Sequence, residues 1–587
     1  MDLITDSRAL MMVKQLLDNT STVRPLIDLQ SQKPKFTPSA INKPFLRATP
    51  ESQGVPSARV AAFLDDMRDD PTLDMHGVLV LRNGKLITEA AFGAYDQHIW
   101  HITHSECKSI TGLAIGILIG EGKLKLEDKL VDLFAGKISR INQLTHRNIT
   151  VKHLLTMTSG ITFNEAGSVT ETDWVKCFLE SVVLKEPGTS FNYNSMNTYM
   201  LGCIIKQVTG VGLTDYLTPR LFAPLGITNF FWEKCPMGNE KAGWGLYILP
   251  EDIAKIGQMV LDGGRFEGKQ IVPEEWIKEA TRSQAATPKT LGDYDYGYQI
   301  WVGRNERSFL FNGMFGQNVL GFFDTGVLLV SNAGNNELFQ QSSYYALATK
   351  HFSREEAFSE SKPKLGAGLG ALQNAKKRLC ADLYTPPIEL FGDLFTQRGK
   401  LDIGAICKRL DGKAYFAAGD KRASPVGVYP LFAQTLQNNF TKGLHALSFV
   451  CRNGTLQIVI DETDERHVLE IGFDAPAYND FATHGEIHRV GVSGRFGADE
   501  SGRPVLLLRV SFLEAANARL IKIRFFDGRI VTEWSESPGK GYLIDALASV
   551  KGQSSLLSGI LERSDEELLL FRITRILEPQ VVLNERG

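Results

Sequence analysis

The chain has 587 residues, of which 43% are hydrophobic and 22% are charged. This is the composition of an ordinary globular protein with roughly three or four domain-equivalents. Its 64 basic and 67 acidic residues leave a net charge of −3, which argues against the basic surface of proteins that bind nucleic acid or anionic lipid. We therefore expect neither nucleic acid nor membrane among its partners.

The N-terminus and the cysteines predict a cytoplasmic protein. Met1–Asn19 has early acidic residues and no apolar core followed by small residues, so it does not have the pattern of a signal peptide. The longest apolar run, Ile110–Ile119, is too short to span a bilayer and indicates a buried helix. The seven cysteines are scattered and include no Cys-x-x-Cys pair, which favours reduced thiols over a disulfide framework or a zinc site.

The first elements are an N-terminal extension, a helix and a hairpin. Residues 1–44 are rich in proline and weakly patterned, which suggests a helix followed by an extended arm. Ser57–Met67 has the apolar spacing of a helix, with Ser57 as the expected N-cap. Alternation on both sides of Asn83-Gly84, over residues 76–89, predicts a hairpin with a tight turn.

A mixed region follows and completes the first domain. Helical stretches continue to about Gly264, and apolar runs at 319–323 and 326–331 have the character of strands. A helix around 339–350 closes the region. We therefore predict an α+β domain over residues 45–355.

The rest of the chain predicts a linker and an all-β domain. The Pro- and Gly-rich segment 362–370 marks a linker that contains a helix, over 356–402. From 403 to 587 the apolar-alternating segments are short and separated by turns such as Asn453-Gly454, which predicts an antiparallel β-barrel or sandwich. The segments are Ala446–Cys451, Gly454–Ile460, His467–Phe473, Val505–Phe512 and Leu520–Phe526.

Ser105-Glu106-Cys107-Lys108 is a Ser-x-x-Lys motif. Roughly two or three such matches occur by chance in a chain of this length, and Ser537-Pro538-Gly539-Lys540 at a Pro-Gly turn is one of them. Ser105, in contrast, directly precedes the buried apolar helix, where positions i and i+3 share a face. Burial lowers the pKa of a lysine and lets it accept the proton of the serine. The helix N-terminus supplies N–H groups for an oxyanion. The alternative for an isolated match is a helix cap beside a surface lysine.

Three further segments follow the motif in order: Ser109–Asp128, Ile149–Gly160 and Pro187–Tyr193. Together with the motif they resemble the family of class C β-lactamases, D-alanyl-D-alanine peptidases and esterases, over about residues 45–350. Several motifs in order are more specific than any one of them. The resemblance implies a β-lactamase/transpeptidase-like fold, an antiparallel sheet flanked by helices with a helical subdomain, and no metal or organic cofactor.

The second motif of that family is Tyr-x-Asn, and the matching segment here is Tyr193-Asn194-Ser195. The resemblance implies that Tyr193 serves with Lys108 as the general base, while Ser195 replaces the asparagine. A Tyr-x-Ser form is similar to the branch that includes 6-aminohexanoate-oligomer hydrolases. A phenol has a pKa near 10, and we expect the positive charge of Lys108 to lower it. A core aromatic is the alternative for Tyr193.

The third motif of the family is Lys-Thr-Gly or His-x-Gly on a strand, and Phe311–Gln317 matches it. Gly313 would permit close approach of a ligand, Met314 would supply the second oxyanion N–H, and Gln317 is a further candidate for substrate binding. Phe311 stands where the family has a cation or histidine. This departure favours a neutral ester or amide over a β-lactam or peptidoglycan carboxylate.

The histidines give weaker signals. His101 and His104 precede the nucleophile and either line the pocket or have a structural role. His484 and His488 flank Glu486, but a β-rich segment does not place them on one helical face. We therefore expect no metal site.

The sequence thus predicts a serine hydrolase that forms an acyl-enzyme on Ser105 and acts on a small-molecule ester or amide. A D-amino-acid peptidase or a β-lactamase is the first alternative. A binding or sensory protein without turnover is the second, because of the changes at Phe311 and Ser195. The C-terminal domain resembles the lipocalin-like or other β-barrel appendages of such hydrolases. Covering the cleft, binding a partner and forming a homo-oligomer all remain open for it.

Overall fold

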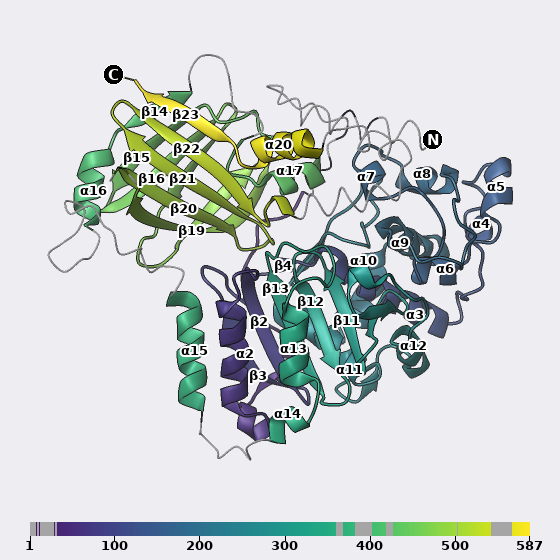
Figure 1. Cartoon of the computed structure of the whole chain (residues 1–587). Helices are drawn as coiled ribbons and strands as arrows, with labels where there is room; N and C mark the ends of the chain where they lie inside the picture. The colour runs from purple at the N-terminus through teal and green to yellow at the C-terminus, as the bar shows by residue number, and fades with distance from the viewer. Residues whose placement is uncertain are drawn as a thin grey trace. The chain divides into compact units, whose positions relative to one another are not determined.

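The computed structural model describes residues 32–359, 368–381, 402–417, 426–499, 503–541 and 566–586, together with positions 8, 11, 27, 29 and 501. The chain divides into two compact units (Figure 1). The mixed unit consists mainly of residues 37–91 and 97–377, and the barrel unit of residues 8–36, 92–96 and 378–587. The predicted extension and linker lie partly outside the described residues.

The mixed unit is built on an eight-stranded sheet in the order β1-β3-β2-β13-β12-β11-β10-β9. All neighbours are antiparallel except β1 and β3. The predicted hairpin is confirmed as β2 and β3, and its turn residues Asn83 and Gly84 have φ angles of 51° and 71°. The strands are β1 (Leu46–Arg47), β2 (Met75–Arg82), β3 (Lys85–Ala91), β9 (Tyr294–Tyr296), β10 (Trp301–Gly303), β11 (Ser308–Gly313), β12 (Gln317–Phe322) and β13 (Val327–Ala333).

Helices cover both faces of this sheet. The hydroxyl of Tyr345, on α13 (Tyr344–Phe352), donates to Asn318 Oδ1 on β12 at 3.1 Å. A Cβ on Gly257, in α11 (Pro250–Leu261), would lie 2.4 Å from Val319 on the same strand. Adjacent residues of a strand point to opposite faces, so α13 and α11 lie on opposite sides. The predicted helix around 339–350 thus forms but begins later, at Tyr344.

The predicted helix at Ser57–Met67 forms as α2 (Ser57–Asp69), which packs beside α13 (Figure 1), but its predicted cap is wrong. Pro56 is the N-cap residue and Ser57 lies inside the helix. Glu51, in the preceding turn η1 (Pro50–Gln53), accepts the Ser57 N–H at 2.8 Å. A carboxylate six residues upstream therefore replaces the local cap.

A helical region lies between strands β4 (His101–Ile102) and β5 (Phe230–Trp232), which join β6 (Leu246–Ile248) in a small sheet. The predicted buried helix is α3 (Lys108–Gly120), buried from Lys108 through Leu118. The turn η2 (His104–Cys107) connects β4 to α3. The other elements of the unit are α4 (Leu130–Leu133), α5 (Arg140–His146), α6 (Val151–Leu155), α7 (Glu165–Ser168), α8 (Trp174–Glu180), α9 (Ser195–Thr209), α10 (Leu213–Leu217), η3 (Thr218–Phe222), β7 (Arg265–Phe266), β8 (Lys269–Gln270), α12 (Glu274–Ala280), η4 (Lys289–Leu291), α14 (Glu356–Ser359) and α15 (Leu369–Ala381), whose last residues belong to the barrel unit.

The barrel unit contains one ten-stranded antiparallel sheet in the order β17-β16-β15-β14-β23-β22-β21-β20-β19-β18. The sheet curls into a nearly closed barrel (Figure 1). Between its two edge strands, the Asn479 side chain bonds to the N–H and C=O of Glu470 at 2.9 and 3.1 Å. The strands are β14 (Ala414–Ala417), β15 (Ala446–Arg452), β16 (Thr455–Glu462), β17 (Glu465–Glu470), β18 (Ala477–Thr483), β19 (Glu486–Ala498), β20 (Pro504–Phe512), β21 (Ala518–Phe526), β22 (Arg529–Ser537) and β23 (Gln580–Glu585). The all-β prediction is confirmed, in its barrel form.

Apolar side chains fill the barrel, and a helix is fastened to its wall. Phe449, Ile458, Val492 and Trp534 are among the buried core residues. Helix α16 (Ile403–Leu410) adds its apolar face to this core, and α17 (Leu431–Gln437) and α20 (Glu566–Leu577) are further helices among the described residues of the unit.

A disulfide joins Cys407 of α16 to Cys451 of β15. The prediction of reduced thiols is therefore wrong for this pair. The two cysteines are 44 residues apart in sequence, and only the packing of α16 on the barrel brings them together. The prediction stands for the buried free thiols Cys107, Cys177, Cys203 and Cys235.

The predicted extended arm is seen at Gln32–Phe36, which the structure assigns to the barrel unit. Lys33 Nζ lies 2.8 Å from Glu514 Oε2, and both side chains are buried. The Lys33 N–H also donates to Glu486 Oε1 at 3.1 Å. Removing one partner of a buried ion pair leaves an uncompensated charge, so these contacts fix the arm on the barrel.

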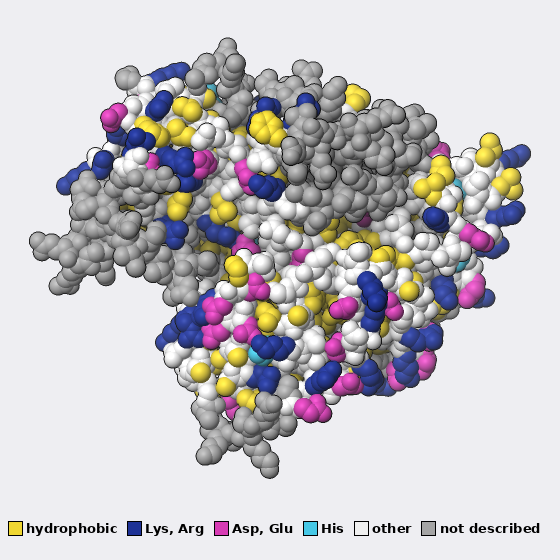
Figure 2. Space-filling view, viewed as in Figure 1, with side chains coloured by type: hydrophobic (Ala, Val, Ile, Leu, Met, Phe, Trp, Pro, Cys, Tyr) yellow, Lys and Arg dark blue, Asp and Glu magenta, His cyan; other side chains and the backbone are white. Residues whose placement is uncertain are grey.

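The surface of the mixed unit has no dominant sign of charge on the face that Figure 2 shows. There, Lys and Arg side chains are interspersed with Asp and Glu. Among the described residues, no helix combines the length and the apolar character needed to cross a bilayer.

Candidate active site

Ser105 and Lys108 lie side by side at the junction of η2 and α3. Lys108 Nζ donates to Ser105 Oγ at 2.7 Å and to the carbonyl of Gly243 at 2.7 Å. Ser105 is partly exposed, whereas the neighbouring residues from 101 to 110 are buried. Ser105 stands in the 3₁₀ turn and not in α3 itself. In a 3₁₀ turn residues i and i+3 are eclipsed, which explains the short contact between the two side chains.

Burial changes the acidity of Lys108. Its side chain is 2% exposed, and desolvation lowers its pKa to about 8, with the Glu165 carboxylate acting in the opposite direction. At pH 7 about one tenth of such lysines are neutral. A neutral Lys108 can accept the Ser105 proton through the hydrogen bond that already joins them.

Tyr193 lies beside the same pair. Its ring centroid is 5.0 Å from Lys108 Nζ, and the Ser105 hydroxyl is near enough to the phenol to affect its acidity. The expected lowering of its pKa is wrong, because burial raises the pKa of Tyr193 far above 10 and the Glu165 charge acts in the same direction. The phenol therefore stays protonated at neutral pH and is placed to donate a proton.

Gly313, at the end of β11, brings this strand directly against the nucleophile turn. A Cβ on Gly313 would lie 2.2 Å from the Thr103 carbonyl and 3.1 Å from the Glu106 nitrogen. The close approach expected at this glycine is therefore to the backbone of η2. Met314 follows in the turn to β12. Within the described part of the chain, its N–H donates to no other group.

The other residues of the third motif are used inside the protein. Phe311 has no exposed surface and packs against the ring of Phe309, so it does not form the substrate surface that we expected. Asn312 donates to Asn318 and to the Tyr345 hydroxyl. Gln317 is fully buried and donates to the Ala333 carbonyl at 2.7 Å. Gln317 thus braces the turn that carries Met314.

Ser195 and its neighbours contact the residues that hold Lys108. Ser195 begins α9 and its backbone lies against Gly243, the residue whose carbonyl receives Lys108. Asn194 caps α9 by accepting the Met196 N–H at 2.9 Å. Glu165 accepts the Ser195 N–H at 2.6 Å and acts electrostatically on Lys108 and Tyr193. Sequence reasoning missed Glu165, because no motif residue is close to it in the chain.

The two histidines before the nucleophile have structural surroundings. His101 Nε2 lies 3.2 Å from His76 Nδ1 in a buried pair. His104 is buried and its ring contacts Phe315, and desolvation with the nearby His101 and Lys108 charges lowers its pKa to about 3. His104 is therefore neutral and does not serve as an acid. In the barrel unit, burial lowers the pKa of His488 well below its usual value. Among the described residues, no three His, Cys, Asp or Glu side chains are grouped to hold a metal ion.

Several of the residues with a positive φ other than glycine lie near the site. They include His104 and Phe315, at 46° and 68°, Ala242 beside the Lys108 acceptor, and Gln299, which receives the Ser109 hydroxyl. Such conformations cost of order 1–3 kcal/mol each and cluster at functional sites. Their presence on several sides of Ser105 and Lys108 indicates a site held in place by its surroundings.

Aromatic side chains form one wall of the site. The Tyr193 ring stacks on Trp301 at 5.8 Å between centroids and meets Phe339 edge-on at 5.1 Å. Tyr296 also packs edge-on against Tyr193 and Trp301. Phe339 is partly exposed, so this wall offers apolar surface beside the nucleophile.

Residues 47–348 match the family model described as Beta-lactamase. They include Ser105, Lys108, Tyr193 and Gly313, and they are more than half of the chain. The chain belongs to the Beta-lactamase family. Members of this family share the serine hydrolase fold, and the fold expected from the motifs is confirmed.

The individual relatives of this chain have low sequence identity to it. It is 26% identical over 271 residues to 6-aminohexanoate-dimer hydrolase of Paenarthrobacter ureafaciens, a match that covers 41% of this chain and 68% of that protein. It is 32% identical over 170 residues to Protein flp of Staphylococcus aureus (strain COL), covering 26% of this chain and only 33% of that protein. The solved structure of a family VIII carboxylesterase aligns with a TM-score of 0.41 at 16% identity, over 57% of this chain and 98% of that chain.

Proposed function

We propose that this chain is a serine hydrolase that forms an acyl-enzyme on Ser105 and hydrolyses an ester or amide of a small molecule. The observation that carries the proposal is the 2.7 Å hydrogen bond between Lys108 Nζ and Ser105 Oγ, made by a buried lysine whose pKa is about 8. A serine becomes a useful nucleophile only when a base within hydrogen-bond reach accepts its proton.

In the proposed reaction neutral Lys108 takes the Ser105 proton while Oγ bonds to the substrate carbonyl carbon. The N–H groups of Ser105 and Met314 would hold the oxyanion. When the intermediate collapses, the bond to the leaving oxygen or nitrogen breaks and that atom takes a proton from the Tyr193 phenol, which Lys108 then replenishes. Water repeats the sequence on the acyl-enzyme and releases the acid. Every proton stays within Ser105, Lys108, Tyr193, water and substrate.

The surroundings of the site support neutral substrates. The aromatic wall of Tyr193, Trp301 and Phe339 suits an apolar acyl or leaving group. The carboxylate of Glu165, which acts on Lys108 and Tyr193, would repel an anionic group bound near them. Phe311 is fully buried and takes no part in this preference. The similarity of this chain to a 6-aminohexanoate-dimer hydrolase is consistent with an amide substrate.

A comparison of two chromogenic substrates tests this function. We expect kcat/KM for p-nitrophenyl butyrate to exceed that for nitrocefin, which carries a carboxylate. Faster nitrocefin hydrolysis would favour the β-lactamase or D-peptidase alternative. Covalent labelling of Ser105 by a fluorophosphonate without turnover of either substrate would favour the sensory alternative.

The cytoplasmic location and the homo-oligomer remain predictions. Disulfides persist mainly in oxidising compartments, so the Cys407–Cys451 bond weighs against a cytoplasmic location. Cell fractionation and the mass of the protein in solution decide these two points.

A further inference from the structure

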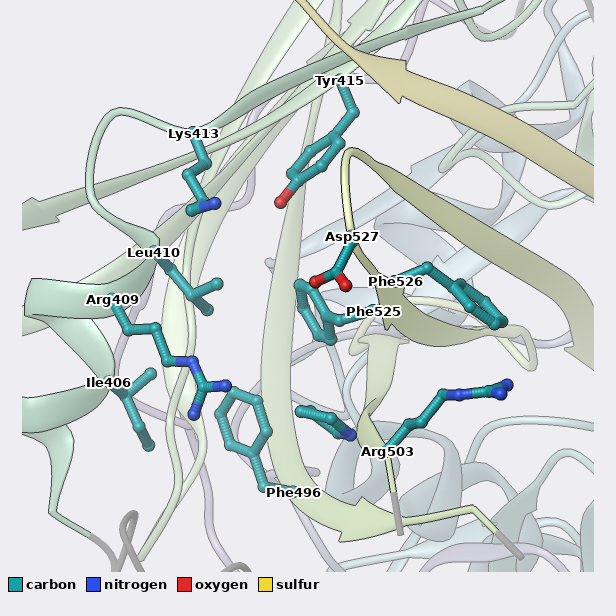
Figure 3. A pocket seen from close by; sticks show the side chains of 11 residues that line it. Ile406, Arg409, Leu410, Lys413, Tyr415, Phe496, Arg503, Phe525, Phe526 and Asp527 are labelled. Carbon is teal, nitrogen blue, oxygen red and sulfur yellow. The ribbon is translucent and has the colours of Figure 1, made fainter. Parts of the chain in front are cut away.

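The barrel unit has a pocket of about 450 Å³ at one end of the barrel. Its lining residues lie at the start of β14, at the end of β19, at the start of β20 and in the turn from β21 to β22. In an antiparallel barrel these ends meet at the same rim. Residues of α16 form the remaining side (Figure 3). The size lies within the ~300–1,000 Å³ typical of small-molecule pockets, which often occur in the mouths of β-barrels.

Apolar side chains form part of the pocket's lining, beside the charged ones. Ile406 and Leu410 of α16 face Phe496 and Phe525 of the barrel (Figure 3), and all four belong to or pack against the barrel core. The Tyr415 side chain, 3% exposed, points its hydroxyl toward the pocket. Such a lining buries hydrocarbon or an aromatic ring, at roughly 25 cal/mol for each Å² removed from water.

The charged side chains of the pocket are mostly basic. Arg409, Lys413 and Arg503 contribute three positive charges, and Asp527 contributes one negative charge. The present ion pairs of two of these cations are with Glu585, 3.2 Å from Lys413, and with Asp499, 3.8 Å from Arg503. All four partners are at least partly exposed, and exposed ion pairs contribute only about 0–1 kcal/mol. A bound anion can therefore compete for Lys413 and Arg503 at little cost.

The side of the pocket formed by α16 is held in place before any ligand arrives. The Cys407–Cys451 disulfide ties α16 to β15. The Cys451 N–H donates to Asp411 Oδ1 at 2.8 Å, and Gly412 and Lys413 exchange backbone hydrogen bonds with Phe449 at 3.0 Å. A preformed pocket loses less free energy on binding than one that must be ordered.

We propose that this pocket binds a small amphipathic anion, a hydrocarbon chain or ring that carries one carboxylate. The apolar part lies among Leu410, Phe496 and Phe525, and the carboxylate lies at the rim with Arg409 and Arg503. This site is separate from Ser105, and the proposal does not depend on the hydrolase activity.

Isothermal titration of the full-length protein with decanoate, kept well below its micellar concentration, tests the proposal. Decylammonium is the matched probe because it has the same chain and the opposite charge. We expect one saturable site for decanoate and binding of decylammonium at least about tenfold weaker, since a charge-assisted bond is lost. Raising the salt concentration should weaken the binding of decanoate, because the cations are near the surface.

The double variant Arg409→Glu/Arg503→Glu should raise the Kd for decanoate at least about tenfold. Both side chains are exposed, so the variant should keep its circular dichroism spectrum. The control is Arg466→Glu, an exposed arginine of β17 that does not line the pocket. It should bind decanoate like the unaltered protein. The proposal would be overturned by equal affinity for the two probes or by the absence of saturable heat. Full decanoate binding by the double variant would also overturn it, because the carboxylate would then bind elsewhere.

Discussion

The acidity of Lys108 makes the pH profile of hydrolysis a test of its role as the base. With a pKa of about 8, set mainly by burial, the neutral fraction of Lys108 rises almost tenfold for each pH unit below 7 and levels off above about 9. We therefore expect kcat/KM for p-nitrophenyl butyrate to follow this rise, with a midpoint near pH 8. Because the base must be neutral, activity is lost as pH falls.

Glu165→Gln tests whether the titrating group is Lys108. The Glu165 carboxylate raises the pKa of Lys108, so its removal should lower the midpoint, by about half to one pH unit. The neutral fraction at pH 7, and with it kcat/KM, should then increase about three- to fivefold. The amide oxygen of glutamine can still accept the Ser195 N–H, so the local structure should persist.

Glu186→Gln is the matched control, because Glu186 is exposed and accepts the Thr189 hydroxyl through its backbone carbonyl, which the substitution keeps. Rates are measured from pH 5.5 to 9.5 at constant ionic strength, with thermal melting at each end of the range. A flat profile, or a midpoint that moves equally in both variants or upward in Glu165→Gln, would refute Lys108 as the group that titrates.

Three further predictions follow from contacts in the structure. Tyr193→Phe should lower kcat about 10²–10⁴-fold with little change in KM, because it removes a proton donor; steady-state kinetics with an alkyl ester measures this, and unchanged kcat would leave Tyr193 a packing residue. Gly313→Ala should abolish hydrolysis and lower stability by about 1–3 kcal/mol, because its Cβ would lie 2.2 Å from the Thr103 carbonyl. Gly136→Ala, where a Cβ meets nothing within 4 Å, is the control in thermal melting. Equal melting temperatures of the two variants would contradict the contact. Digestion without reductant should yield a cross-linked pair of peptides that contain Cys407 and Cys451; recovery of both as free thiols by mass spectrometry would exclude the bond.

Local pattern was sufficient for much of the fold and for the centre of the site. The turn at Asn83-Gly84 and the apolar run of α3 depend on neighbours in the chain, and both formed as expected. The approach of Ser105 and Lys108 also follows from their spacing. The curling of the ten-stranded sheet into a barrel depends on pairing between strands far apart in sequence, so sequence reasoning left the sandwich open.

The remaining features depend on burial and on long-range packing. Phe311 was expected to face the substrate, but its environment comes from Phe309 and the core of the sheet. The phenol of Tyr193 was expected to be acidified by Lys108, and desolvation raises its pKa instead. Glu165 acts on Lys108 across 57 positions of sequence, which no local spacing reveals. In each case the physical cause is the surroundings that the fold supplies.

The most direct test of the central claim is to locate the phosphonyl adduct after reaction with a fluorophosphonate, by intact mass and peptide mapping. The account predicts a single adduct on Ser105. It also predicts neither adduct nor ester turnover in Ser105→Ala. This variant should melt near the temperature of the unaltered protein, since it loses the hydrogen bond that the Ser105 hydroxyl accepts from Lys108, and one such bond contributes about 1–2 kcal/mol. An adduct on another residue, or full turnover of p-nitrophenyl butyrate by a folded Ser105→Ala variant, would contradict it.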